Sequence, residues 1–193
     1  GVTTPFLKKL ARTPTERSGM STELKPVLDV CCGGRMFWFD QEDNRALYLD
    51  IREGVRIVDI GTKGTKGRKP IKVNPDFISD FRSLPFPDES FYHIVFDPPH
   101  FQKGAGSTGK IGFSYGLLTD NWRDDLAKGF SECFRVLKPY GTLIFKWAET
   151  EFPLKEVLAL TKEKPLYGHK SGKKATTHWV SFIKTVAPPK GAV

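Results

Sequence analysis

Long hydrophobic runs, cysteine frameworks and zinc-type motifs are all missing from this chain of 193 residues. No stretch approaches the roughly 18 apolar residues of a membrane-spanning helix, and the N-terminus lacks the basic, apolar and small-residue order of a secretory signal. The three cysteines, Cys31, Cys32 and Cys133, have the spacing of neither a disulfide framework nor a zinc site. These absences predict a cytoplasmic protein with reduced thiols, without a bound metal and without membrane contact.

Positive charge is in excess, with 30 Lys and Arg against 22 Asp and Glu, a formal net charge of +8. Basic residues gather in two glycine-containing segments, which we expect to be loops. The first holds Lys63, Lys66, Arg68, Lys69 and Lys72, and the second holds Lys170, Lys173 and Lys174. Such clusters suit contacts with phosphate groups, although lysine-rich solubility explains them equally well.

Short apolar runs alternate with amphipathic stretches through the middle of the chain, which is typical of a parallel α/β sheet. The runs that predict strands span residues 26–30, 46–50, 77–80, 92–96, 141–147 and 177–184. Residues 120–137 place apolar side chains at spacings of three and four, which predicts an amphipathic helix. We therefore expect one doubly wound α/β domain over residues 21–185, with an N-terminal extension at 1–20 and a tail at 186–193.

Three of the predicted strands end at an aspartate. Asp29 precedes the glycine pair of Asp29-Val30-Cys31-Cys32-Gly33-Gly34, a segment that is neither a dinucleotide-binding nor a phosphate-loop signature. Asp50 follows about twenty residues later, where a carboxylate can accept hydrogen bonds from ribose hydroxyls. Asp80 ends the third strand, near the expected position of an adenine. Loop capping and turn formation are the alternatives for Asp50 and Asp80.

The fourth predicted strand ends at Asp97-Pro98-Pro99-His100. Two prolines stop the strand and leave the carbonyl groups of Asp97 and Pro98 without ladder partners. Two acceptors that receive hydrogen bonds from both N–H groups of an exocyclic amine favour the pyramidal nitrogen that attacks the methyl group of a sulfonium. A flat ring at His100 can stack on the aromatic base that carries this amine. The alternative is a rigid turn that only ends the strand.

The order of these motifs resembles the class I methyltransferases that use S-adenosyl-L-methionine, in particular the amino-methylating enzymes with an Asp/Asn-Pro-Pro-aromatic motif. The resemblance covers roughly residues 25–185 and extends to small bacterial and prophage methyltransferases with a late Gly-His-Lys-Ser-Gly-Lys-Lys segment. It implies a Rossmann-like fold with a C-terminal antiparallel strand. Two positions depart from the family pattern: Cys31 stands in place of a glycine, and His100 in place of Tyr, Phe or Trp.

The resemblance also implies a set of site residues. The catalytic residues would be Asp97, Pro98, Pro99 and His100. The residues expected to contact S-adenosyl-L-methionine are Asp29, Cys31, Gly33, Gly34, Asp50, Asp80 and Phe81. The substrate contacts we expect are Phe101, Lys146, Lys170 and Lys173, with a simple salt bridge as the alternative for Lys146.

The expected reaction is methylation of an exocyclic amine of a nucleic-acid base, adenine N6 in DNA or RNA, with cytosine N4 as a second target. Methylation of a pyrimidine carbon would need a cysteine thiolate, commonly in a Pro-Cys pair, and no cysteine here follows a proline. A chain of this size leaves no room for a separate recognition domain, so loops, a protein partner or substrate shape would supply specificity. Two alternatives stay open: a small-molecule N-methyltransferase, and a noncatalytic module that binds the cofactor or a nucleic acid.

Overall fold

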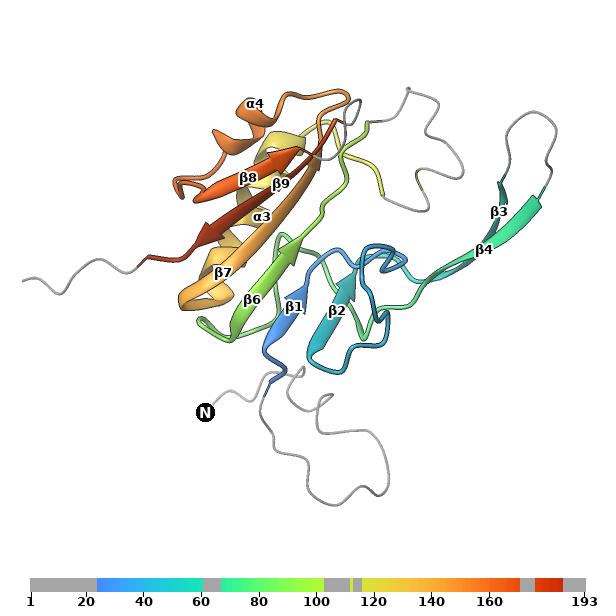
Figure 1. Ribbon diagram of the computed structural model, residues 1–193, viewed down its shortest axis with the longest axis horizontal. Helices are drawn as coiled ribbons and strands as arrows, with labels where there is room; N and C mark the ends of the chain where they lie inside the picture. The colour runs from blue at the N-terminus through green and yellow to red at the C-terminus, as the bar shows by residue number, and fades with distance from the viewer. Residues whose placement is uncertain (1–23, 61–66, 103–111, 113–115, 171–175, 186–193) are drawn as a thin grey trace, which may run out of the picture.

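A computed structural model describes residues 24–60, 67–102, 112, 116–170 and 176–185, so the expected N-terminal extension and C-terminal tail lie outside it. Seven strands form one sheet in the order β5-β2-β1-β6-β7-β9-β8 (Figure 1). Their bounds are β1 Val27–Asp29, β2 Ala46–Asp50, β5 Phe77–Ile78, β6 Phe91–Phe96, β7 Leu137–Ala148, β8 Tyr167–Lys170 and β9 Thr177–Ile183. Only β9 runs against its neighbours in this sheet; the other paired strands are parallel. The predicted Rossmann-like α/β fold with a C-terminal antiparallel strand is confirmed.

Helix α3, Trp122–Val136, crosses from β6 to β7 and lies on one face of the sheet (Figure 1). Its buried side chains recur at spacings of three and four, as the sequence predicts, and they include Trp122, which packs on Phe152 in the core. Phe130 meets the sheet, with ring centroids 5.3 Å from Phe96 and 4.9 Å from Phe145. Aromatic packing of this kind holds the carboxyl ends of β6 and β7 in place.

Strand β7 begins at residue 137, earlier than the predicted start at 141. The segment Lys138-Pro139-Tyr140-Gly141 forms an irregularity in the strand: the pairing with β6 shifts between Phe91 and His93, and Tyr140 has a φ of 60°. Such a bulge lets the chain turn into the sheet directly after α3 without a separate loop.

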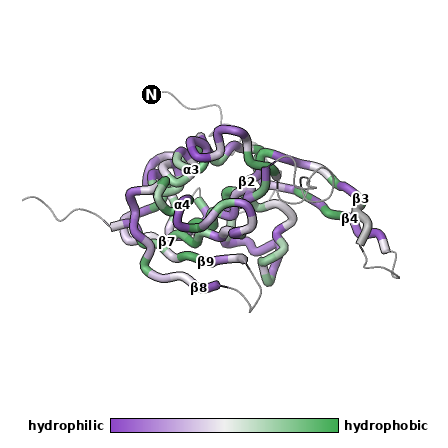
Figure 2. Tube along the Cα trace, turned by 90° about the horizontal axis from the view of Figure 1, so that it is seen from above, coloured by the Kyte–Doolittle hydropathy of each residue, from purple (hydrophilic) through white to green (hydrophobic). Residues whose placement is uncertain are grey.

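Strands β3, Gly54–Ile60, and β4, Gly67–Val73, form a separate two-stranded antiparallel sheet. Both views show this pair, which we call the β3–β4 arm, projecting away from the seven-stranded sheet (Figures 1 and 2). We expected a glycine-broken basic loop here, so the arm corrects that interpretation. Likewise, part of the expected loop at 168–174 is the edge strand β8.

Few helices accompany the strands in the described part of the chain. Residues 30–45, between β1 and β2, run through turns, and the short helix α4, Leu154–Leu158, precedes β8. Neither α3 nor α4 combines the length and the apolar character that crossing a bilayer demands.

Candidate functional site

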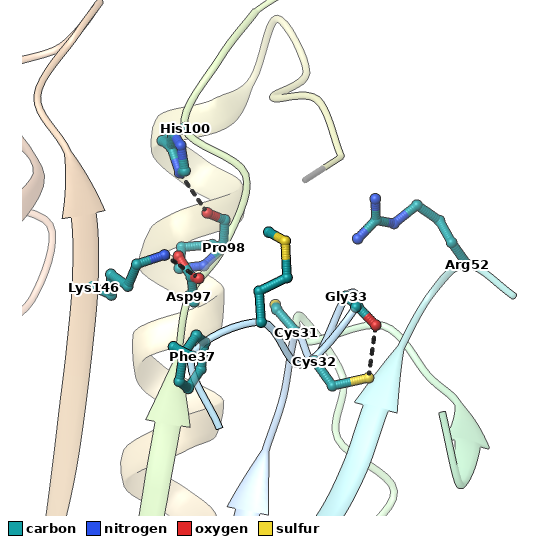
Figure 3. A pocket seen from close by; sticks show the side chains of 11 residues that line it. Cys31, Cys32, Gly33, Phe37, Arg52, Asp97, Pro98, His100 and Lys146 are labelled. Carbon is teal, nitrogen blue, oxygen red and sulfur yellow. Dashed lines mark hydrogen bonds and ion pairs between the residues drawn. The ribbon is translucent and has the colours of Figure 1, made fainter. Parts of the chain in front are cut away.

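Two neighbouring cavities lie where β1, β2 and β6 end, as expected for an open α/β sheet. The first has a volume of about 240 Å³, and its wall includes Gly33, Asp97, His100 and Lys146 (Figure 3). The second has a volume of about 170 Å³, and its wall includes Asp50, Asp80, Phe81 and Pro99. Cys31 and Arg52 line both cavities, so they stand where the two spaces meet.

Asp97 and Lys146 form an ion pair across the ends of β6 and β7. Lys146 Nζ donates a hydrogen bond of 2.6 Å to Asp97 Oδ2 (Figure 3). The ammonium group also lies 5.5 Å from the ring centre of Phe37 and 5.7 Å from that of Trp179, within the range of cation–π attraction. Lys146 therefore forms the salt bridge that was the alternative for this residue, and it also lines the first cavity. Its contact with a substrate stays a prediction.

The second oxygen of the Asp97 carboxylate, Oδ1, is buried and has no hydrogen-bond partner among the described residues. Burial raises the pKa of Asp97 above the ordinary carboxylate value, while the charge and hydrogen bond of Lys146 oppose that rise. A buried acceptor without a partner is costly. It is therefore a strong candidate for the atom that a ligand contacts.

His100 is only 6% exposed, and its ring packs against Phe101 and Trp147 with centroid distances of 4.5 and 6.1 Å. Its Nδ1 lies 3.4 Å from the carbonyl oxygen of Pro98, a long hydrogen bond (Figure 3). Burial lowers the pKa of His100, which favours the neutral ring at neutral pH. One lone pair of the Pro98 carbonyl thus has a partner within the chain, and the other remains for a ligand.

The glycine segment after β1 approaches the first cavity through its backbone. Gly33 has a φ of 49°, a left-handed conformation that suits glycine, and its N–H donates to Asp50 Oδ2 at 2.9 Å. Asp29 is fully buried and lines neither cavity, because its two oxygens accept hydrogen bonds from the Trp38 indole at 2.8 Å and the Cys31 backbone at 3.2 Å. Asp29 shapes the loop rather than the cavity wall.

Asp50 ends β2 at the predicted place and accepts four hydrogen bonds from the described residues. Arg52 supplies three of them, from its backbone N–H at 2.9 Å, from Nε at 2.8 Å and from Nη2 at 2.9 Å; Gly33 supplies the fourth. Asp50 thus caps the loop before Arg52, and its contact with ribose hydroxyls stays a prediction. A ligand hydroxyl would reach Asp50 only by displacing the Arg52 side chain.

Asp80 repeats this arrangement at the second cavity. Arg82 binds its carboxylate through Nε and Nη2, at 3.0 and 2.6 Å, and these hydrogen bonds hold the pKa of Asp80 below its ordinary value. Arg82 Nη1 also donates to Asp125 Oδ1 at 2.9 Å, which ties the turn after β5 to helix α3. The sequence Asp-x-Arg occurs three times, at residues 43–45, 50–52 and 80–82, and each arginine forms an ion pair with the aspartate two residues before it. Only the second and third of these pairs line the two cavities.

The cysteines around the cavities are poor nucleophiles. Burial raises the pKa of Cys31 well above the ordinary thiol value and raises that of Cys32 to about 12. A thiol is a good nucleophile only as the thiolate. The site therefore lacks the activated cysteine that a covalent mechanism would use.

Most of the predicted site residues come together in these cavities. Those that line one or both are Cys31, Gly33, Gly34, Asp50, Asp80, Phe81, Asp97, Pro98, Pro99, His100 and Lys146. Phe101 lies behind His100, and Lys170 is exposed on β8; neither lines either of these two cavities. Lys173 lies outside the described residues, as do Lys63, Lys66 and Lys174.

Sequence reasoning missed several wall residues: Met36, Phe37, Arg52, Arg82 and the segment Gly116–Thr119. The repeated Asp-x-Arg spacing is the one signal that could have identified the two arginines. Within the described ranges, no group of three or more His, Cys, Asp and Glu side chains is placed to hold a metal ion.

No protein-family model matches the chain, and no curated protein matches its sequence. Among solved structures, the chain is similar to the PH0226 protein of Pyrococcus horikoshii OT3, with a TM-score of 0.53 and 17% identity over 81% of this chain and 80% of that one. A SAM-dependent methyltransferase from Methanosarcina mazei has a TM-score of 0.49 and 14% identity, over 83% and 92% of the two chains. The cyclase SpnF has a TM-score of 0.47 and 13% identity, over 95% and 81%. The likeness to the Pyrococcus protein shows the fold; no activity follows from these similarities.

Proposed function

We propose that the protein transfers a methyl group from S-adenosyl-L-methionine to an exocyclic amino group of a nucleic-acid base, adenine N6 in the first place. The observation that carries this proposal is Asp97 Oδ1, a buried carboxylate oxygen without a partner among the described residues, in a Pro-Pro corner that walls the first cavity. Its partner oxygen is held by Lys146. The carboxylate is thus oriented so that Oδ1 can accept one hydrogen bond from an N–H group of a ligand.

The two cavities fit the parts of the cofactor. The glycine backbone and Cys31 would lie along its methionine part, and the apolar wall at Phe81 and Leu118 would contact the adenine. Asp50, in the wall of the second cavity beside Arg52, would accept the ribose hydroxyls once Arg52 moves away. When bound, S-adenosyl-L-methionine supplies an electrophilic methyl group on a sulfonium centre.

The chain's own residues would orient the amine and receive its proton. Asp97 Oδ1 and the Pro98 carbonyl would each accept one N–H group, which favours a pyramidal nitrogen with its lone pair directed at the methyl carbon. As the N–C bond forms, the C–S bond breaks and its electron pair stays on sulfur. The methylated nitrogen then releases one proton through Asp97 to water. No covalent enzyme intermediate is needed, which agrees with the raised thiol pKa values.

Two substitutions at Asp97 test this proposal, with S-adenosyl-L-methionine labelled on its methyl group, separate DNA and RNA pools, and mass analysis of the nucleosides. Asp97→Ala removes the acceptor, so transfer should fall by about 100-fold or more, while the thermal shift produced by the cofactor persists. Asp97→Asn keeps one acceptor oxygen and should retain more activity than Asp97→Ala. Full activity of Asp97→Ala would refute the assignment. Transfer to small amines only, independent of salt, would favour the small-molecule alternative.

A further inference from the structure

The β3–β4 arm has no part in the chemistry proposed above, although its base lies beside the first cavity. The backbone oxygen of Lys72 is 3.5 Å from the position that a Cβ on Gly34 would take, and Gly34 lines that cavity. Arg35 Nη2 donates a hydrogen bond of 2.7 Å to the carbonyl oxygen of Asn74, directly after β4. The arm is therefore anchored at the rim of the site and projects outward from it (Figure 1).

The arm carries basic side chains on both of its faces. In its antiparallel register, Val55 pairs with Lys72 and Val58 with Lys69, and directly paired residues share a face. Because successive residues of a strand alternate between faces, Arg68 shares the face of Lys72, and Arg56 shares the face of Lys69. Against these four basic residues the two strands contain one acidic residue, Asp59.

Two of these cations have no carboxylate partner among the described residues. Lys69 and Lys72 are exposed, and nowhere in the described ranges does either ammonium group have a carboxylate partner. The apolar side chains of Val55 and Ile57 are also 62% and 58% exposed. A two-stranded hairpin is marginally stable on its own, so a partner that covers it would stabilise it.

We propose that the β3–β4 arm binds the sugar–phosphate backbone of the nucleic-acid substrate and thereby guides the target base to the adjoining cavity. The charge complementarity is direct, because phosphodiesters present the negative charges that Lys69 and Lys72 lack among the described residues. This inference rests on the proposed function and deepens it, because it names the part of the chain that would contact the substrate outside the cavities. Phosphate contacts of this kind position a substrate without reading its sequence.

A pair of variants with equal charge changes tests the arm. Lys69→Glu with Lys72→Glu alters the arm, and Lys162→Glu with Lys164→Glu changes two exposed lysines that precede β8, at the opposite edge of the sheet. Binding of fluorescent single-stranded DNA and RNA oligonucleotides is measured by anisotropy at several salt concentrations. The arm variant should bind at least about tenfold more weakly, with the slope of log K against log salt reduced by about 1.4, or 0.7 for each lost phosphate contact. The control variant should bind like the wild type.

Three outcomes would overturn the inference. They are unchanged binding by the arm variant, an equal loss in both variants, and a loss of self-association in light scattering without a change in oligonucleotide binding. A milder variant, Lys69→Gln with Lys72→Gln, repeats the measurement with a smaller charge change in case the glutamates disturb the hairpin. The DNA and RNA arms of the experiment distinguish the two sources of phosphodiester.

Failure of this inference differs from failure of the proposed function. If Asp97→Ala abolishes transfer while the arm variant binds and methylates normally, the arm has no substrate role and the function stands. If the arm variant loses binding while Asp97→Ala remains fully active, the arm binds nucleic acid and the proposed chemistry is wrong.

Discussion

Lys146 Nζ lies 2.6 Å from Asp97 Oδ2, so two neighbouring parallel strands each contribute one partner of a single ion pair at the Pro-Pro corner. The pair fixes one carboxylate oxygen and leaves the other, Oδ1, buried without a partner among the described residues. An ion pair in such a place orients the acceptor and also supports its negative charge.

Replacing Lys146 with Met should lower methyl transfer at neutral pH by about 10- to 100-fold, because the buried carboxylate loses its counter-charge. Burial already raises the pKa of Asp97, and removing the ammonium group would raise it further. The ionised acceptor is lost as pH falls through that pKa, so the activity of the variant should begin to fall at a higher pH. Lys146→Arg should restore part of the activity. A pH profile that superimposes on the wild-type profile would exclude this role.

Replacing Arg52 with Ala should destabilise the free protein by about 1–3 kcal/mol, since Asp50 is 3% exposed and would lose two side-chain hydrogen bonds. S-adenosyl-L-methionine should then bind without having to displace an arginine. We expect a larger thermal shift on adding the cofactor to the variant than to the wild type. A smaller shift in the variant would mean that Arg52 itself holds the cofactor.

Replacing Gly116 with Ala should damage the Pro-Pro corner specifically. Gly116 has a φ of 76°, and a Cβ there would lie 2.8 Å from Pro99 Cγ. Gly141→Ala is the control, because an added Cβ there would also lie 2.8 Å from a neighbouring atom, Leu137 Cδ1, but near the start of β7 and in the wall of neither cavity. Gly116→Ala also carries about 1–2 kcal/mol of backbone strain, and only this variant should reduce transfer per folded molecule. Equal activities would show that the contact with Pro99 does not matter.

The stability of the protein should depend on the titration of Asp29, whose pKa burial raises from 3.8 to about 7. A carboxyl with a raised folded-state pKa contributes stability below its unfolded pKa and loses it as pH rises through the folded value. Asp29→Asn cannot titrate. The free energy of unfolding of the wild type, relative to that of this variant, should therefore fall by a few kcal/mol between pH 4 and pH 7, with a slope of up to about 1.4 kcal/mol per pH unit. Urea unfolding at four pH values measures this, and parallel curves would contradict it.

The sheet could be predicted from the sequence because its buried strands are continuous apolar runs that end at acidic residues. Val27–Asp29 and Ala46–Asp50 are of this kind, and the structure places each of them between two other strands of the sheet. The Pro-Pro corner followed from the same logic, since two prolines must end β6. The order of apolar, acidic and proline residues along the chain was sufficient to predict these elements.

Other features depend on contacts that no local pattern contains. The ion pair of Asp97 with Lys146 joins residues 49 positions apart, and it exists because β6 and β7 are neighbours. Asp29 stands at a predicted ligand position, yet the indole of Trp38 binds it away from the cavities. The β3–β4 arm escaped prediction because Val73 is the only buried side chain among those described in it, so no clear period of two in hydrophobicity marks its strands.

The pairing of the arm has a consequence for how a protein of this kind changes over evolutionary time. β5 pairs directly with β2, and β3 and β4 pair only with each other, so no ladder hydrogen bond of the seven-stranded sheet depends on residues 54–73. Insertions, deletions and exchanges there would leave the register of the seven-stranded sheet untouched. Under the proposed function, selection could therefore change the substrate contacts of the arm while conserving the residues around the cavities, and a grafted hairpin would be a direct way to give the protein new substrate contacts in the laboratory.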